Sequence, residues 1–162
     1  MDIITYEMIS LAKKGDAQAQ FDLGLEYEVG CDLQQDYQKA VEWYTKAAKQ
    51  GHAEAQAHLG DCYHYGYGVE KDYQKAVYWQ TKSAERGCAK GQENLSFYYE
   101  WGFGVEQDYV KAHEWLIKAS ESAGVPKRRG TWTYICYKKR NKKIKKLQRQ
   151  AKRQIKRQSK VM

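Results

Sequence analysis

Hydrophobic and polar positions along this chain repeat with a fixed spacing of 36 residues. The clearest copy, residues 72–84, runs Asp-Tyr-Gln-Lys-Ala-Val-Tyr-Trp-Gln-Thr-Lys-Ser-Ala, and near-copies begin at Asp36 and Asp108. A fixed period of about 20–50 residues is the mark of stacked repeats, which cover one another's hydrophobic faces. The pattern therefore predicts an array of helical repeats.

The array predicts one domain over residues 1–125, followed by an extension over 126–162. The predicted repeats span 15–50, 51–86 and 87–122. Segment 3–14 falls in register with the second half of a repeat. We expect it to form a lone capping helix over the first exposed face, since the terminal units of solenoids are atypical.

The first half of each repeat predicts a helix with one packed face, on which residues are spaced three and four apart. In the first repeat this face carries Gln20, Leu23, Gly24 and Tyr27. The glycine recurs as Gly60, whereas the third repeat has Ser96 there. A glycine inside a helix costs about 1 kcal/mol relative to alanine. Its recurrence predicts a place where two helices cross closely.

The second half of each repeat predicts another helix. We expect an aspartate to cap the start of each one by accepting hydrogen bonds from free backbone N–H groups: Asp36, Asp72 and Asp108. Ala40, Trp43 and Ala47, with their copies, form the expected buried stripe of this helix.

These strings resemble a known repeat. Ala-x-Ala-Gln-x-x-Leu-Gly-x-x-Tyr, a Gly-x-Gly-Val turn and Asp-Tyr-x-Lys-Ala-x-x-Trp-x-x-Lys-Ala-Ala are similar to the Sel-one-like repeat, a relative of the tetratricopeptide repeat, over residues 15–121. The resemblance implies an all-α fold, a right-handed α-solenoid of antiparallel helix pairs, and an adaptor role in assembling other proteins. The sequence departs from the pattern at Asp32, where the other turns have glycine, and at Ser96.

Charge is divided sharply between the two parts of the chain. The whole sequence has 28 Lys and Arg against 20 Asp and Glu, a net charge of +8. Residues 126–162 hold 16 of the basic residues and no acidic one, which leaves 12 basic and 20 acidic residues, a net of −8, in 1–125. The protein is therefore predicted to be an acidic body with a strongly basic tail.

Within the tail, the apolar segment 131–137 predicts the start of a capping helix on the open end of the third repeat. Residues 138–160 predict a basic helix with a narrow apolar stripe: Ile144, Leu147, Ala151 and Ile155. The candidate anion-binding residues are Lys138, Lys139, Arg140, Lys142, Lys143, Lys145, Lys146, Arg149, Lys152 and Arg153.

This charge favours an anionic partner, such as nucleic acid or a ribosome, bound without sequence-specific readout because residues 138–162 contain no aromatic residue. An anionic membrane is a weaker alternative, since the stripe lacks Trp and Phe anchors. Segment 138–143 also resembles a nuclear import signal, which is relevant only in a eukaryote. Alternatively, the tail could lie on the acidic body and mask its binding surface.

No motif sets a nucleophile beside a base, so we expect a non-catalytic protein without a cofactor. His58, Asp61 and Cys62 share one helical face and resemble metal ligands. The favoured alternative is a polar, solvent-facing surface, and we predict no metal site.

The cysteines at 31, 62, 88 and 136 occupy different positions of the repeat, whereas disulfide-bonded members of the family carry a regular pair. We expect reduced thiols and a cytoplasmic location. The start of the chain does not resemble a secretory signal. No stretch approaches the roughly 20 apolar residues of a membrane span.

The expected binding surface is a concave groove, because the first helix of each repeat lines that side of a solenoid. The outward positions in the first repeat are Gln18, Asp22, Leu25 and Val29. The candidate groove residues in the other two repeats are Glu54, His58, Asp61, Tyr65, Lys90, Asn94, Phe97 and Trp101. Aromatic residues are enriched at binding hot spots, which favours a partner protein for a monomeric adaptor. The alternative is that unconstrained surface positions simply vary.

Overall fold

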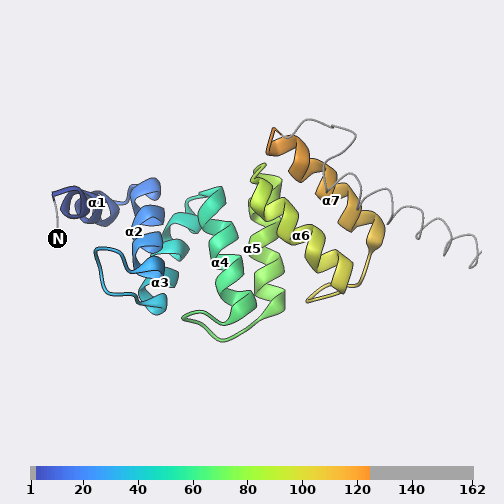
Figure 1. Cartoon of the computed structure of the whole chain (residues 1–162), viewed down its shortest axis with the longest axis horizontal. Coiled ribbons are helices and arrows are strands. Elements are labelled where there is room, and N and C mark those ends of the chain that lie inside the picture. The colour runs from blue at the N-terminus through green and yellow to red at the C-terminus, as the bar shows by residue number, and fades with distance from the viewer. Residues whose placement is uncertain (1–2, 125–162) are drawn as a thin grey trace, which may run out of the picture. The chain divides into compact units, whose positions relative to one another are not determined.

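The computed structural model describes residues 3–124, where the backbone forms seven α-helices and no strand (Figure 1). The helices are α1 (Ile3–Lys14), α2 (Ala17–Val29), α3 (Tyr37–Lys49), α4 (Ala53–Tyr65), α5 (Tyr73–Glu85), α6 (Ala89–Trp101) and α7 (Tyr109–Ser122). The chain divides into two units, Met1–Ala123 and Gly124–Met162. The predicted basic helix and the predicted capping helix of the tail lie outside the described residues.

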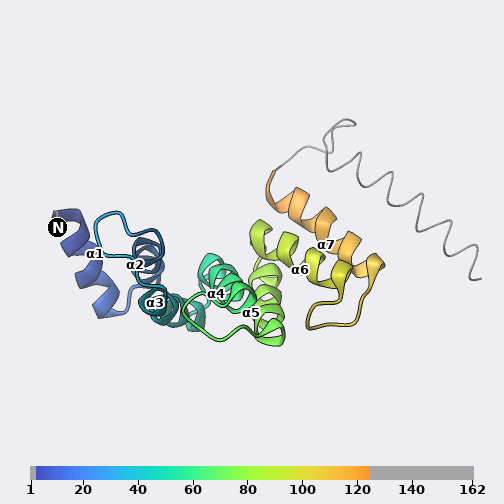
Figure 2. The same cartoon turned by 60° about the horizontal axis from the view of Figure 1, so that its bottom comes forward.

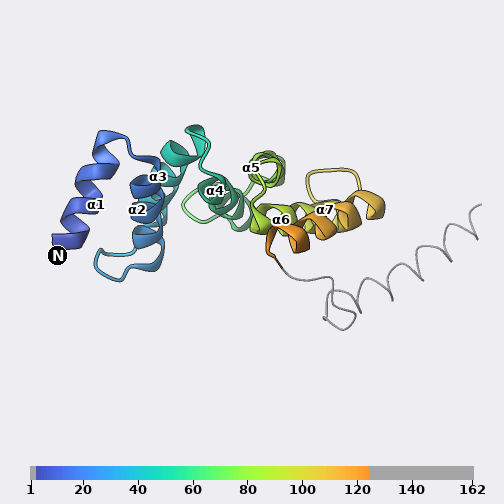
Figure 3. The same ribbon diagram turned by 90° about the horizontal axis from the view of Figure 1, so that it is seen from above.

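The seven helices form an all-α solenoid, as the sequence predicts. Helix α1 belongs to no helix pair. The pairs α2–α3, α4–α5 and α6–α7 follow it along the first unit (Figures 1 and 2). Each helix packs on the next one in the chain, and α4 also contacts α6, so the first helices of the second and third repeats meet. Figure 3 shows the same succession from above.

The second helices begin at the predicted caps. The carboxylates of Asp36, Asp72 and Asp108 accept the backbone N–H of Lys39, Lys75 and Lys111 at 3.0, 2.9 and 3.1 Å. These hydrogen bonds lower the pKa of all three aspartates. Each aspartate is therefore ionised at neutral pH, the form that caps a helix start best.

The turn glycine of the second repeat packs closely on the first repeat. Gly68 has a φ of +67°, and a Cβ atom there would lie 2.2 Å from the carbonyl oxygen of Tyr37. The turn of the second repeat therefore packs against the first residue of α3, the second helix of the first repeat. The turn of the first repeat carries Asp32 at the corresponding position, and its carboxylate accepts the Thr5 hydroxyl of α1 at 3.3 Å.

Two helices cross closely at the recurring helical glycine, as predicted. A Cβ atom on Gly24 would lie 2.6 Å from two ring carbons of Tyr44, and one on Gly60 would lie 2.6 Å from Nε2 of Gln80. Such distances are well below ordinary contact, so in the first two repeats the absence of a side chain at this position allows the close approach of Tyr44 and Gln80.

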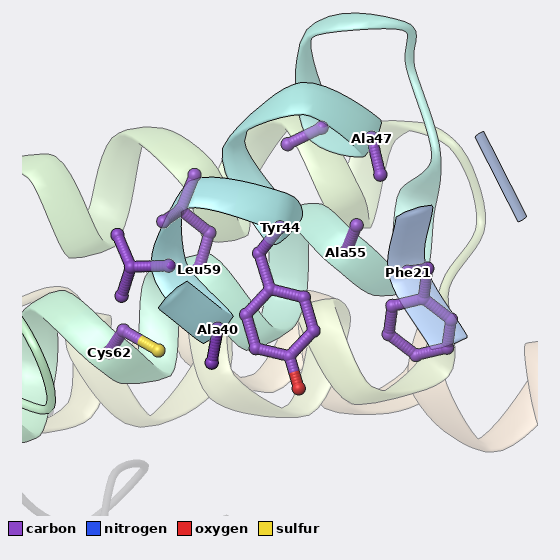
Figure 4. Packing of buried hydrophobic residues seen from close by; sticks show 9 residues of the cluster. Phe21, Ala40, Tyr44, Ala47, Ala55, Leu59 and Cys62 are labelled. Atoms are coloured by element: carbon purple, nitrogen blue, oxygen red, sulfur yellow. The ribbon is translucent and has the colours of Figure 1, made fainter. Parts of the chain in front are cut away.

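The predicted buried stripe of the second helix is wrong in one position. Trp43 is only half-buried, with the Lys46 ammonium 3.8 Å from its ring, whereas the next residue, Tyr44, is completely buried. Figure 4 shows the Tyr44 ring among Ala40, Ala55 and Phe21. The second helix packs against both its own first helix and the next repeat. Its buried face is therefore wider than a narrow stripe, and the tryptophan lies at its edge.

The recurring glutamine fixes each repeat to the preceding helix. Its side-chain amide donates to a backbone carbonyl in the last turn of that helix: Gln20 to Ala12, Gln56 to Ala48 and Gln92 to Ala84, at 3.1, 3.0 and 3.2 Å. The same carbonyl groups also accept the backbone N–H of Gly15, Gly51 and Gly87, so the glutamine adds a second, buried hydrogen bond that links the repeat to the preceding helix.

Candidate functional site

The candidate groove residues lie on the face formed by the first helices, and several of them bond across neighbouring repeats. His58 Nδ1 lies 3.2 Å from Glu28 Oε2, which joins α4 to α2. Lys90 Nζ and Asn94 Nδ2 of α6 both contact the Asp61 carboxylate of α4, at 2.8 and 2.7 Å. The structure therefore brings residues of all three repeats together on one surface.

Asp61 departs from the expectation of a free outward residue. In addition to Lys90 and Asn94, the side chain of Gln80 donates to it at 2.9 Å. Leu25 is also partly buried against the core. Because adjacent first helices pack against each other, the positions between them become contacts between repeats. Asp61 and Asn94 thus stabilise the stack, and the surface left for a ligand is smaller than predicted.

Glu28, which the sequence analysis did not single out, organises the first part of this face. Its carboxylate accepts the Tyr44 hydroxyl as well as the His58 ring N–H. The hydrogen bond from His58, followed by that from Tyr44, lowers the pKa of Glu28. Burial raises the pKa of Tyr44. Nothing in the repeat indicated this role, because the corresponding positions carry His64 and Glu100.

The metal-like trio does not converge. His58 and Asp61 are bonded to the partners given above, while Cys62 lies in the core beside Tyr44 and Leu59. Burial raises the pKa of the Cys62 thiol to about 12, so it is protonated at neutral pH. Among residues 3–124, no group of three His, Cys, Asp or Glu side chains could hold a metal ion. Cys31 and Cys88 are free thiols, as is Cys62.

A hollow of about 640 Å³ lies at the N-terminal ends of α4 and α6. Three predicted groove residues, Glu54, His58 and Lys90, line it together with Phe21, His52 and Arg86. The His52 ring stacks on Phe21 with centroids 4.8 Å apart, and its Nδ1 accepts the Ala55 N–H that caps α4. The hollow therefore has an aromatic wall formed by Phe21 and His52, and a rim that carries both acidic and basic side chains.

At the opposite ends of the same helices lies a row of aromatic rings, here called the aromatic row. Its members, in order of contact, are Tyr37, Tyr67, Tyr65, His64, Phe97 and Trp101. Neighbouring ring centroids are 4.5–6.2 Å apart, which is the range of favourable aromatic pairs. The predicted aromatic residues Tyr65, Phe97 and Trp101 are 59%, 39% and 58% exposed.

His64 joins the two parts of the aromatic row, the tyrosines before it and the rings of the third repeat after it. Its ring contacts both Tyr65 and Phe97, and its Nδ1 lies 2.9 Å from the hydroxyl of Tyr98. Burial, with a smaller contribution from Lys71, lowers the pKa of His64. A neutral ring therefore accepts the Tyr98 hydrogen bond at neutral pH. The sequence did not indicate that His64, Tyr37 and Tyr67 belong to this row, because the alignment of their rings depends on how the turns fold.

The sequence profile of the Sel1 repeat matches residues 17–52, 53–88 and 89–123. The chain belongs to the Sel1 repeat family, whose members generally act as non-catalytic scaffolds for protein interactions. A comparison with curated proteins found no match. In the described part of the chain, no helix has the length and apolar character needed to cross a bilayer.

Solved structures support the same fold. The chain is similar to c5321, a protective antigen present in uropathogenic Escherichia coli strains, with 40% identity over 78% of this chain and a TM-score of 0.70. It spans only 26% of that protein's chain. It is 35% identical to a Sel1 repeat protein from Oxalobacter formigenes, over 72% of this chain and 88% of that one, with a TM-score of 0.69. Cysteine rich protein B of Helicobacter pylori, at 21% identity over 75% of this chain and 96% of that one, shares the fold with a TM-score of 0.58.

Proposed function

We propose that this chain is a non-catalytic adaptor that holds a segment of a partner protein across the face of its first helices. The observation that carries the proposal is the aromatic row. Tyr65, Phe97 and Trp101 present large exposed rings on a surface where His58 is bonded to Glu28 and Asn94 to Asp61. Contiguous exposed apolar surface on a soluble domain commonly marks an interaction site.

The rings of the row pack on one another. Tyr65 stacks on Tyr67, and Tyr67 stacks on Tyr37, with centroids 5.3 and 5.1 Å apart. Phe97 is held between His64 and Trp101. Since these rings lose little conformational freedom on binding, more of the contact energy is available for affinity.

The hollow and the row define the length of the bound segment. Helix α4 runs from Ala53 at the hollow to Tyr65 in the row, and its 13 residues span about 20 Å. An extended segment of about six residues covers that distance. A partner peptide of this length would contact both features at once, which favours an extended ligand over a small molecule.

The pairing of titratable groups on this face supports a non-catalytic role. A general acid at neutral pH needs a raised carboxyl pKa. Glu28 has a lowered one, and Asp61 is occupied by three donors.

The test is a triple substitution of Tyr65, Phe97 and Trp101 by alanine in the full chain. The matched control replaces three exposed tyrosines elsewhere: Tyr6, Tyr78 and Tyr109. Partner recovery is measured by quantitative co-purification, with far-ultraviolet circular dichroism to verify folding. We expect recovery to fall at least about tenfold in the first variant and to persist in the control. Equal recovery by both folded variants would refute the groove.

Nucleic-acid binding by the tail is a second proposed function, favoured by its 16 basic residues and complete lack of acidic ones. If eight cations contact phosphates on duplex DNA, the logarithm of the binding constant falls with the logarithm of salt concentration at a slope near −7. The full chain is compared with a chain that ends at residue 125. Equal retention of both on DNA would exclude the tail as the binding element.

A further inference from the structure

We propose that the partner segment on the aromatic row is cationic, with lysine or arginine side chains seated over the exposed rings. This inference rests on the proposed function, since it names the chemistry of the segment that the row binds. Two independent features of the described residues carry it, namely the charge of the helices and the placement of their lysines.

The first and second helices carry opposite charge. Helices α2, α4 and α6 contain seven Asp and Glu residues and a single lysine, Lys90, whose ammonium is paired with Asp61. Helices α3, α5 and α7 contain seven lysines and four glutamates. The binding face is thus built on the acidic helices, and electrostatic complementarity favours a positively charged segment there.

The lysines of the solenoid lie over a different set of rings. Seven lysine-over-ring contacts occur among the described residues, at Tyr27, Trp43, Tyr63, Tyr73, Tyr78, Tyr99 and Trp115. Within that same part of the chain, no such contact involves Tyr65, Tyr67 or Trp101. Tyr67 is stacked between Tyr37 and Tyr65, so the rings left for a cation are those of Tyr65 and Trp101, which are 59% and 58% exposed.

The centre of the row is compatible with a cation. The pKa of His64 is lowered by burial and by the Lys71 ammonium, so its ring is uncharged at neutral pH, and Lys71 itself lies over the Tyr73 ring outside the row. An acidic segment would instead meet the carboxylates of the first helices, including exposed Glu54 and Glu93. A purely apolar segment would use the rings but gain nothing from the surrounding negative charge.

The experiment is a selection from a displayed library of random 12-residue peptides on the full chain. A parallel selection uses the Tyr65, Phe97 and Trp101 triple alanine variant, and only peptides that the variant fails to enrich are counted. We expect these row-dependent peptides to carry lysine and arginine well above their frequency in the library. Row-dependent peptides without a basic excess would overturn the cationic inference and leave the adaptor function standing. A lack of row-dependent peptides would overturn both.

A second measurement fixes the role of the cations. In the strongest selected peptide, each lysine or arginine is replaced by glutamine, and affinity for the full chain is measured by fluorescence anisotropy. Replacement of a lysine or arginine that lies over a ring should lower the affinity of the peptide by about 2- to 30-fold. Unchanged affinity after every replacement would refute ring-seated cations.

The basic tail of the chain could compete with a partner segment for the aromatic row, because both carry positive charge. A full-length variant with glutamine at the ten candidate tail positions, from Lys138 to Arg153, tests this directly. Affinity for the selected peptide should stay within about twofold of the unmodified chain. A gain of tenfold or more would show that the tail itself occupies the row, which contradicts a partner segment as its resident ligand.

Discussion

Replacement of Gly24 by alanine tests the close helix crossing on which the repeat depends. The new Cβ would lie 2.6 Å from Cδ1 and Cε1 of Tyr44. Tyr44 is completely buried, and its hydroxyl donates to Glu28, so the ring has little freedom to move. Ordinary carbon contacts are about 3.5–4.0 Å, so the ring or the helix must shift by about 1 Å.

Two opposing effects determine how far Gly24→Ala changes the free energy of unfolding. Alanine favours the helix over glycine by about 1 kcal/mol. Overpacking of a buried site costs about 1–3 kcal/mol, and a displacement of this size belongs at the upper end. The expected net result is a loss of about 1–2 kcal/mol in the free energy of unfolding. Without the clash with Tyr44, the same substitution would stabilise the protein. A decrease in the free energy of unfolding therefore indicates the clash, and an increase indicates its absence.

The assay is equilibrium urea unfolding followed by circular dichroism, with amide hydrogen exchange of α2 and α3 because repeats can open separately. The same substitution is then made in a Tyr44→Leu background, since the third repeat carries Ser96 and Leu116 at the corresponding positions. In that background, alanine at position 24 should be neutral or stabilising. An equal loss in both backgrounds would refute the contact as the cause.

Two further predictions concern the turn and the aromatic row. Gly68→Ala should destabilise the stack by at least about 2 kcal/mol more than Gly87→Ala in urea unfolding, because both adopt positive φ but only Gly68 faces a backbone oxygen, that of Tyr37. Equal losses of stability in the two variants would show that the positive φ alone is responsible and that the contact with Tyr37 contributes nothing. The pKa of His64 is lowered by burial from its usual 6.5, so the unfolded state binds more protons below that pH and stability should fall as the solution is acidified. His64→Asn should flatten the stability profile between about pH 7 and 5, and an unchanged slope would contradict the assignment.

The repeat itself was predictable, because its determinants are local. The spacing of 36 residues, the aspartate caps and the crossing glycines each follow from residues within one repeat. The exchange of glycine for Asp32 in the first turn was visible but unexplained. The role of glycine in the second turn required the structure, in which Gly68 rests on the start of α3.

The candidate site was predictable only in outline. Helical spacing indicated that Tyr65, Phe97 and Trp101 face outward, and all three are exposed. It did not indicate that Asp61 would be bonded to the next repeat, because that contact depends on how closely α4 and α6 approach. The role of His64 was likewise hidden, since it depends on rings from two repeats and a turn.

Site-specific photo-cross-linking tests the central claim, that a partner binds on the aromatic row. A photoreactive benzoylphenylalanine replaces Trp101 in one full-length variant and Tyr78, similarly exposed but on α5, in another. After irradiation in the presence of the selected peptide or a co-purified partner, adducts are quantified by mass spectrometry. Adducts at position 101 in large excess over position 78 are the predicted result. Equal yields at the two positions, or a higher yield at 78, would contradict the claim.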